Sequence, residues 1–263
     1  MRRVKQRARS HSTSTSSVHS GTWRFGCCGY VAYTHPIPFQ SHSADHPKNS
    51  PIFKDVKVTY TPILLGGLHK ACGNLAPILI TNKKEWIDRE RERWADIFQI
   101  PLRKGVPRGF PVSTVGAMRV LTALGEEVEP EVFARAIEVF WSALWNPEAE
   151  VLRGVKSEDG EFNIKDPAVL RALLSRVDEI GGDLAARVVE RMADKEVKDK
   201  LVANTNTSFK AGAFGIPWFQ CVNSRGETEG FWGFDHVGQV VRFLGLEEGA
   251  DFGRSGKHVK ALL

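Results

Sequence analysis

The residues with the clearest chemical potential lie in the 25 residues from Gly212 to His236. Within this stretch, Pro217 precedes an apolar run, and a proline is tolerated at the start of an edge strand because it removes only one hydrogen-bond donor. If the bond between Ile216 and Pro217 is cis, the N–H and C=O groups of Ile216 face outward and can pair with an extended peptide. Asp235 adds a carboxylate for an amino group. The stretch therefore predicts a site for a small peptide with a free amine.

The cysteines and histidines give little support for disulfide exchange or metal binding. The chain has four cysteines and no Cys-x-x-Cys pair, which argues against disulfide exchange and favours an intracellular, reducing environment. Cys72 and Cys221 are interpreted as small buried side chains. A metal site formed by His42 and His46 with the cysteines at positions 27 and 28 lacks an ordered ligand set, so no metal is predicted.

The elements that must position these residues are a strand, a helical block, and a hairpin with a final helix. The alternation from Val56 to Leu65 predicts a strand, and the glycines of residues 66–74 predict a loop. Residues 82–210 have helical periodicity, with Asp166 and Pro167 as one helix start. After residue 212, strand patterns on both sides of residues 223–226 predict a hairpin, and Asp235 is expected to cap the last helix. This order predicts an α/β fold interrupted by a helical insertion.

The charge is unevenly distributed along the chain. The net charge is +5, but residues 1–50 contain seven Lys/Arg residues and one acid, so the remainder is close to neutral and a basic nucleic-acid-binding face is not expected. No apolar run approaches the length of a membrane span. Residues 1–50 are irregular, basic and rich in Ser, and three interpretations stay open: a mitochondrial presequence within the first 26 residues, a disordered tail, or a wrongly assigned first exon.

Two motifs carry a family resemblance. The segment Gly212-Ala213-Phe214-Gly215-Ile216-Pro217, followed after the hairpin by Gly233-Phe234-Asp235, resembles the C-terminal half of kappa-class glutathione transferases. The earlier Pro62-Ile63-Leu64-Leu65-Gly66-Gly67, with Lys70-Ala71-Cys72-Gly73-Asn74, is similar to the loop after that family's second strand. This family is related to the disulfide oxidoreductase DsbA and to 2-hydroxychromene-2-carboxylate isomerase.

The resemblance implies a thioredoxin-like fold with a large helical insertion. The thioredoxin-like domain would be discontinuous, over residues 51–81 and 211–250, with the insertion over 82–210 and a tail over 251–263. The first strand and helix are in doubt: residues 30–33 are a candidate strand, but residues 40–49 contain a proline and no apolar stripe.

The resemblance also implies a glutathione site. By position, Asn74 would bind glutathione from its loop, Ile216 would pair with the cysteinyl backbone, and Pro217 would be the cis-proline. Phe234, through its main chain, and Asp235 would hold the γ-glutamyl end. The simpler alternatives are that Asn74 is only a turn residue and that Asp235 only caps its helix.

The family's Ser-Pro-aromatic motif, whose hydroxyl stabilises the thiolate of glutathione, is not found. Thr34 stands about where a hydroxyl is wanted, and Ser41 is a second candidate, so the catalytic residue is left unassigned.

The expected function is that of a glutathione transferase that conjugates small hydrophobic electrophiles or reduces hydroperoxides. A glutathione-dependent isomerase and a non-catalytic glutathione-binding module remain as alternatives. Glutathione would be the co-substrate, with no permanently bound cofactor, and the chain would form a homodimer. Mitochondrial, peroxisomal and cytoplasmic locations stay open, and the C-terminal Lys260-Ala261-Leu262-Leu263 departs from the peroxisomal tripeptide of some relatives.

Overall fold

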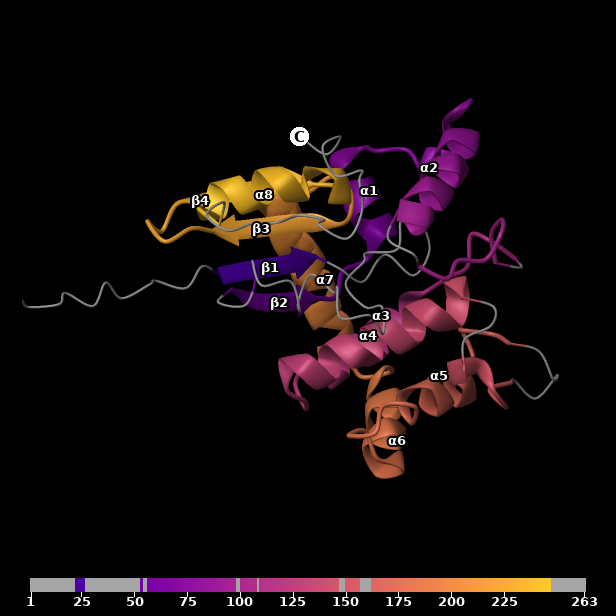
Figure 1. Ribbon diagram of the computed structural model, residues 1–263. Helices are drawn as coiled ribbons and strands as arrows, with labels where there is room; N and C mark the ends of the chain where they lie inside the picture. Colours follow the sequence, from indigo (N-terminus) through magenta and orange to yellow (C-terminus); the bar gives the residue numbers. More distant parts are fainter. Residues whose placement is uncertain are drawn as a thin grey trace, which may run out of the picture.

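The computed structural model describes residues 22–26, 53, 56–97, 100–107, 109–146, 150–156 and 162–246. In these ranges a mixed sheet is joined to a block of helices (Figure 1). The elements in chain order are β1 (Thr22–Gly26), β2 (Lys57–Thr61), α1 (Leu65–Cys72), η3 (Pro77–Leu79), α2 (Lys83–Ile97), α3 (Val115–Leu124), α4 (Pro130–Trp145), η4 (Glu150–Leu152), α5 (Pro167–Leu174), α6 (Gly182–Arg191), α7 (Lys195–Lys210), β3 (Trp218–Val222), β4 (Thr228–Trp232), η5 (Phe234–His236) and α8 (Val237–Leu244).

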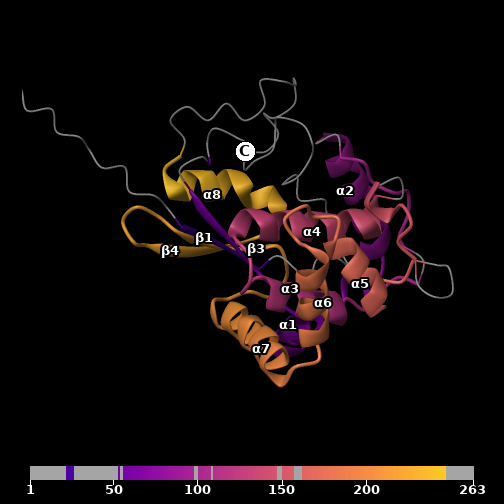
Figure 2. The same ribbon diagram turned by 90° about the horizontal axis from the view of Figure 1, so that it is seen from below.

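The sheet has the strand order β2-β1-β3-β4. Strand β1 is parallel to β2 and antiparallel to β3, and β3 and β4 form an antiparallel hairpin. Helix α8 lies on one side of the sheet, and α1 and α7 lie on the other (Figure 2). The alternation of β3 matches this arrangement: Phe219 and Cys221 join the core beneath α8, whereas Trp218 packs with residues of α1.

The position of β1 corrects one expectation. Residues 1–50 were expected to be irregular, with residues 30–33 as the candidate first strand, but Thr22–Gly26 form a strand between β2 and β3. A presequence that comprised the first 26 residues would include this strand. Residues 30–33 lie outside the described part of the chain. The strand is only five residues long and stands in a basic, Ser-rich segment, which explains why the sequence pattern did not indicate it.

The end of β2 corrects a second expectation. The predicted strand to Leu65 stops at Thr61, because Pro62 cannot donate to the ladder. Beyond the strand, a side chain of α7 bonds the backbone instead: the amide of Asn204 donates to the carbonyl of Pro62 at 3.2 Å. The predicted loop of residues 66–74 is largely the helix α1, since its Leu68 is fully buried and packing outweighs the poor helix propensity of the glycines.

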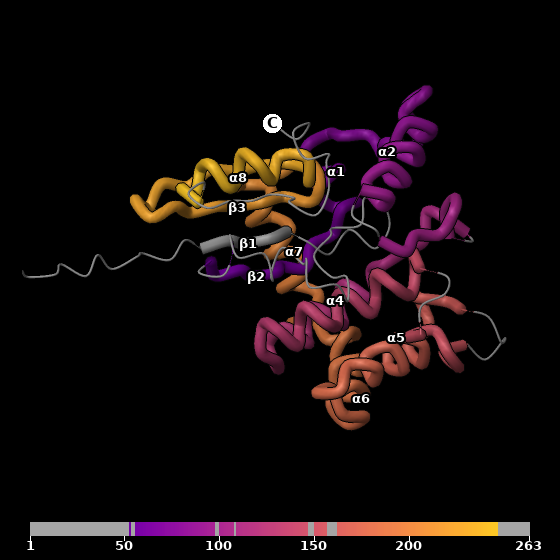
Figure 3. The backbone as a smooth tube through the Cα atoms, in the orientation of Figure 1, coloured from indigo at the N-terminus to yellow at the C-terminus, as the bar shows by residue number. Residues whose placement is uncertain are grey.

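The helices α2 to α7 occupy the predicted insertion (Figure 3). As predicted, Asp166 and Pro167 begin a helix, and the Asp166 carboxylate accepts a hydrogen bond from the N–H of Ala168 at 2.8 Å. The large hydrophobic core is shared: it contains Leu121 of α3 and Phe140 of α4, together with Phe219 of β3. The helical block and the sheet are therefore one packed unit rather than two separate cores.

The hairpin forms where the sequence predicts it. The side-chain oxygen of Asn223 accepts hydrogen bonds from the N–H groups of Arg225 and Glu227, each at 3.0 Å, and Gly226 takes the positive φ of 78° that the turn requires. The predicted cap of the last helix was wrong. Asp235 lies inside η5, and α8 begins at Val237 without any side-chain cap.

Candidate functional site

The centre of the candidate site is the loop between α7 and β3. The peptide bond between Ile216 and Pro217 is cis. The Ile216 side chain is buried with Ile63 and Leu68 of the α1 side, which fixes the loop against the body of the protein. Within the described residues, no hydrogen bond is recorded for the backbone N–H or C=O of Ile216. These main-chain groups are the ones that a peptide ligand would pair with.

Asn74 is tied directly to this loop. Helix α1 ends with Gly73 in the left-handed conformation, at φ 67°, and the next N–H group, that of Asn74, donates to the carbonyl of His69 at 2.9 Å. The side-chain amide of Asn74 then donates to the carbonyl of Phe214 at 3.1 Å. The simpler interpretation of Asn74 as a turn residue therefore misses a contact between two segments that lie far apart in the sequence.

Asp235 is held near the same loop because Gly233, two residues before it, is hydrogen-bonded to that loop. The N–H of Gly233 donates to the carbonyl of Pro217 at 3.0 Å. Gly233 has a φ of 90°, and after this turn the Phe234 ring points inward, edge-on to Trp94 with centroids 5.6 Å apart. The Asp235 side chain points outward and is 62% exposed. The carboxylate is therefore presented to solvent beside the cis-proline loop.

The three components offer complementary chemistry over a short stretch of surface. An exposed carboxylate attracts an ammonium group, a main-chain N–H and C=O pair with an extended backbone, and the exposed side chain of Asn74 adds an amide. This arrangement can hold a short extended peptide with an amino group at one end. The structure therefore brings Asn74, Ile216, Pro217, Phe234 and Asp235 to one loop, and their role in binding glutathione stays a prediction.

Aromatic side chains flank the loop, and the sequence analysis did not anticipate them. The rings of Phe214 and Trp232 are 41% and 43% exposed, and their centroids are 4.9 Å apart. A methyl group on Gly215 would come within 2.5 Å of the Trp232 indole nitrogen, and one on Gly230 within 2.2 Å of the Trp218 ring. The two glycines thus make room for two tryptophans. Glycine at these positions is a signal that could have been noticed in the sequence.

The candidate catalytic residues cannot be placed. Thr34 and Ser41 lie outside the described residues. The described backbone indicates only where this segment begins: strand β1 ends at Gly26, which stands opposite Trp218 in the antiparallel register. The last residue of β1 therefore stands one residue position from Pro217, and Thr34 as the catalytic residue stays a prediction.

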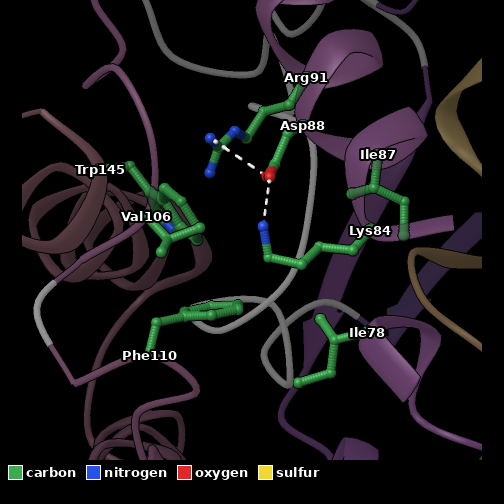
Figure 4. A pocket seen from close by; sticks show the side chains of 8 residues that line it. All are labelled: Ile78, Lys84, Ile87, Asp88, Arg91, Val106, Phe110 and Trp145. Carbon is green, nitrogen blue, oxygen red and sulfur yellow. Dashed lines mark hydrogen bonds and ion pairs between the residues drawn. The ribbon is translucent and has the colours of Figure 1, made fainter. Parts of the chain in front are cut away.

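A small pocket beside α2 is explained by the packing of Arg91 (Figure 4). Arg91 is 2% exposed, donates to the carbonyl of Gly105 at 2.6 Å, and lies over the Trp145 ring at 4.7 Å. Its guanidinium is 3.6 Å from Asp88, which also pairs with Lys84. Burial lowers the pKa of Arg91, and the charge of Asp88 opposes that shift. Arg91 thus links α2 to α4 through the Trp145 ring. None of the predicted site residues lines this pocket.

A larger cleft of about 200 Å³ lies beside β2, between the α3–α4 turn and α7. Thr61, Phe133 and Lys200 are among its lining residues, and the predicted site residues are not. In the part of the chain that the structure describes, no cluster of His, Cys, Asp and Glu is arranged to hold a metal ion. No described helix has the length and apolarity needed to cross a bilayer.

Comparisons with known proteins agree with this architecture. The DSBA-like thioredoxin domain family matches residues 39–245. A solved structure of 2-hydroxychromene-2-carboxylate isomerase superimposes with a TM-score of 0.58, covering 85% of this chain and 94% of that one, at 18% sequence identity. The predicted thioredoxin-like fold with a helical insertion is confirmed.

Three curated relatives share a name. The chain is 26% identical over 198 residues to glutathione S-transferase kappa 1 of Rattus norvegicus and 28% identical over 197 residues to that of Caenorhabditis elegans. It is 25% identical over 198 residues to the Homo sapiens protein of the same name. Each alignment covers 73% of this chain and 79% of the relative. The similarity to this class predicted from the two motifs is therefore confirmed over most of the chain.

Proposed function

Because the chain belongs to the DsbA-like thioredoxin domain family, we propose that it binds glutathione at the cis-proline loop and acts as a glutathione transferase of the kappa type. The similarity to proteins named glutathione S-transferase kappa 1 supports this choice within the family. The absence of a Cys-x-x-Cys pair argues against the alternative of disulfide exchange.

The observation that carries the proposal is the pair of hydrogen bonds that unites the site. One runs from the Asn74 side chain to the carbonyl of Phe214, and the other from the N–H of Gly233 to the carbonyl of Pro217. They hold the end of α1 and the start of η5 against the same loop. An extended tripeptide has two amide groups and an amine, which match the groups that this arrangement presents.

Each residue then has a distinct task. The Asp235 carboxylate would bind the ammonium of the γ-glutamyl residue, and the main chain of Phe234 would bind its carboxylate end. The backbone of Ile216, held by the cis bond to Pro217, would pair with the cysteinyl residue of glutathione. Asn74 would contact the ligand from the opposite side of the loop.

The reaction would use the thiolate of glutathione as nucleophile. With an aryl halide, a carbon–sulfur bond forms, the carbon–halogen bond breaks, halide leaves, and the thiol proton passes to solvent. A hydroxyl that donates a hydrogen bond to the thiolate would favour that form, and Thr34 remains the candidate for it. The exposed rings of Phe214 and Trp232 support a small hydrophobic electrophile as the second substrate.

The binding test compares two Asp-to-Ala variants by isothermal titration with glutathione. Asp235→Ala should weaken binding about tenfold, since it removes one partly solvated charge-assisted hydrogen bond. Asp178→Ala, an exposed aspartate of the helical block, should bind like the parent chain. Equal affinities for the parent chain and both variants would remove Asp235 from the site, and no binding by the parent chain would remove the function.

Turnover separates the transferase from its alternatives. Conjugation of a model aryl halide, lost in Thr34→Ala, would support the transferase with Thr34 as the hydroxyl. Conjugation that survives in Thr34→Ala would support the transferase and reject that residue. Tight binding without conjugation would contradict the transferase, favouring the isomerase if a chromene carboxylate is isomerised and the non-catalytic module if it is not.

We also propose a homodimer. Several large apolar side chains between the end of α1 and the first turn of α2 are exposed, which is unusual for a surface that stays in water; they are Leu75, Leu79, Ile80 and Trp86. Sedimentation velocity should give about twice the monomer mass of 29.3 kDa, and Leu79→Glu should shift it toward the monomer. A monomer at all concentrations would contradict the proposal.

A further inference from the structure

His236 sits directly beside the Asp235 carboxylate. Its Nδ1 atom is 3.4 Å from Oδ1 of Asp235, and the side chain as a whole is 38% exposed. The Nδ1 atom itself is buried and has no hydrogen-bond partner within the described residues. A buried imidazole nitrogen without a hydrogen bond is unfavourable, and the carboxylate next to it is the group that would compensate its charge.

The turn before this pair keeps the carboxylate in place. A methyl group on Gly233 would lie 2.3 Å from Oδ1 of Asp235 and 3.6 Å from Nδ1 of His236. The carboxylate therefore lies over the Gly233 Cα atom and close to the imidazole. Gly233 in turn donates its N–H to the carbonyl of Pro217 in the cis-proline loop.

The ionisable groups around His236 come from the elements packed against η5 and α8. Helix α8 packs on β3, β4 and η5. The ionisable side chains of these elements and of α8 itself, besides the pair, are Cys221, Glu229 and Arg242. Helix α2 also contacts η5, through Trp94 on Phe234, and adds the charged side chains of Lys83, Lys84, Glu85, Asp88, Arg89, Glu90, Arg91, Glu92, Arg93 and Asp96. Within the described part of the chain, the ion-pair contact of His236 is with Asp235.

We propose that His236 competes with the ligand for the Asp235 carboxylate and that it couples binding of the ligand's amino group to release of a proton. The proposal rests on the function proposed above, because it takes Asp235 as the carboxylate that receives the ammonium of glutathione. When the ligand is bound and His236 is protonated, the ligand ammonium and the imidazolium both lie next to the Asp235 carboxylate. Binding then favours the neutral imidazole, and the proton passes to the buffer.

The sign of the effect follows from this linkage. The ligand-bound state holds fewer protons than the unbound state, so affinity rises with pH across the range in which imidazoles titrate, about pH 5 to 8. Two cations about 6 Å apart, in surroundings between water and a protein surface, repel enough to change affinity by about threefold to tenfold. Affinity should therefore fall by about this factor from the upper to the lower end of the range.

The experiment uses S-methylglutathione, whose blocked thiol cannot itself release a proton. Titration calorimetry at about pH 6.5 in two buffers of different ionisation enthalpy gives the number of protons released on binding. The parent chain should release a fraction of one proton. His69→Gln, which changes the other histidine in the described residues, should release the same fraction.

Two substitutions at position 236 must move affinity in opposite directions. His236→Gln should bind tightly at every pH without proton release, because the competing charge is gone. His236→Arg should bind weakly at every pH, also without proton release, because the charge is permanent. Equal affinities for the two variants, or unchanged proton release in His236→Gln, would overturn the proposal. Failure of the parent chain to bind S-methylglutathione at all would instead count against the proposed function.

Discussion

Replacing Gly233 by alanine perturbs the site at a single backbone position. Gly233 has φ 90° and ψ 148°, a conformation that an L-residue with a Cβ atom rarely adopts. The added methyl group would also meet Oδ1 of Asp235 at 2.3 Å. Since the carboxylate is the end of a rotatable side chain, it can move away, and the substitution displaces it from the cis-proline loop.

The two consequences have separate magnitudes. The unfavourable backbone conformation should lower the free energy of unfolding by about 1–3 kcal/mol. Moving the carboxylate should remove its charge-assisted hydrogen bond with the ligand ammonium. Such a bond is worth about 1.5–3 kcal/mol, and the 62% exposure of Asp235 favours the lower end. The dissociation constant for glutathione should therefore rise about tenfold.

Urea unfolding followed by circular dichroism and titration calorimetry with glutathione measure the two effects. Gly226→Ala is the matched control, because Gly226 also has a positive φ, 78°, but no atom lies near its added methyl group. That variant should lose stability by about 1–2 kcal/mol and keep its affinity. If Gly233→Ala binds glutathione as tightly as Gly226→Ala does, the assignment of Asp235 to the ligand ammonium is wrong.

Three further outcomes follow from the packing and the charges. Burial raises the pKa of the Cys221 thiol to about 12, so Cys221 should react with a thiol reagent much more slowly than the partly exposed Cys72, and equal rates would contradict its burial. The hydrogen bond from Lys200 lowers the pKa of Glu126 below its usual 4.5, so the pair stabilises the fold above about pH 4.5 and is lost as pH falls through the lowered value. Glu126→Gln should therefore lower the free energy of unfolding by about 0.5–1 kcal/mol at neutral pH, and this difference should shrink as the pH falls below 4.5; a difference independent of pH would refute this. Asn223→Ala leaves two backbone N–H groups of the hairpin turn without their acceptor and should cost about 1–3 kcal/mol in urea unfolding, whereas an unchanged midpoint would count against the turn.

The sequence predicted the parts of the fold that depend on local pattern. The hairpin and the helix start at Asp166 have turn and cap residues that act over a few positions, so they could be recognised directly. The relative placement of Asn74 and Ile216 came from the resemblance, since their connection through Phe214 spans 140 residues. No periodicity reports a contact over that separation.

The errors have physical causes as well. Helix α1 contains two adjacent glycines, which predict a loop, yet burial of Leu68 against the sheet side stabilises the helix. Asp235 has the residue type of a cap, but the turn at Gly233 shifts the helix start to Val237 and leaves the carboxylate exposed. In the first case tertiary packing decided the outcome, and in the second a backbone turn at Gly233 did.

The most direct measurement follows the backbone amide of Ile216 by nuclear magnetic resonance as S-methylglutathione is added to the isotope-labelled chain. A hydrogen bond to the ligand backbone should shift this amide strongly and slow its exchange with solvent, with a second large shift at Asp235. Shifts confined to residues of the cleft beside β2, such as Thr61 and Lys200, with Ile216 unmoved, would contradict binding at the cis-proline loop.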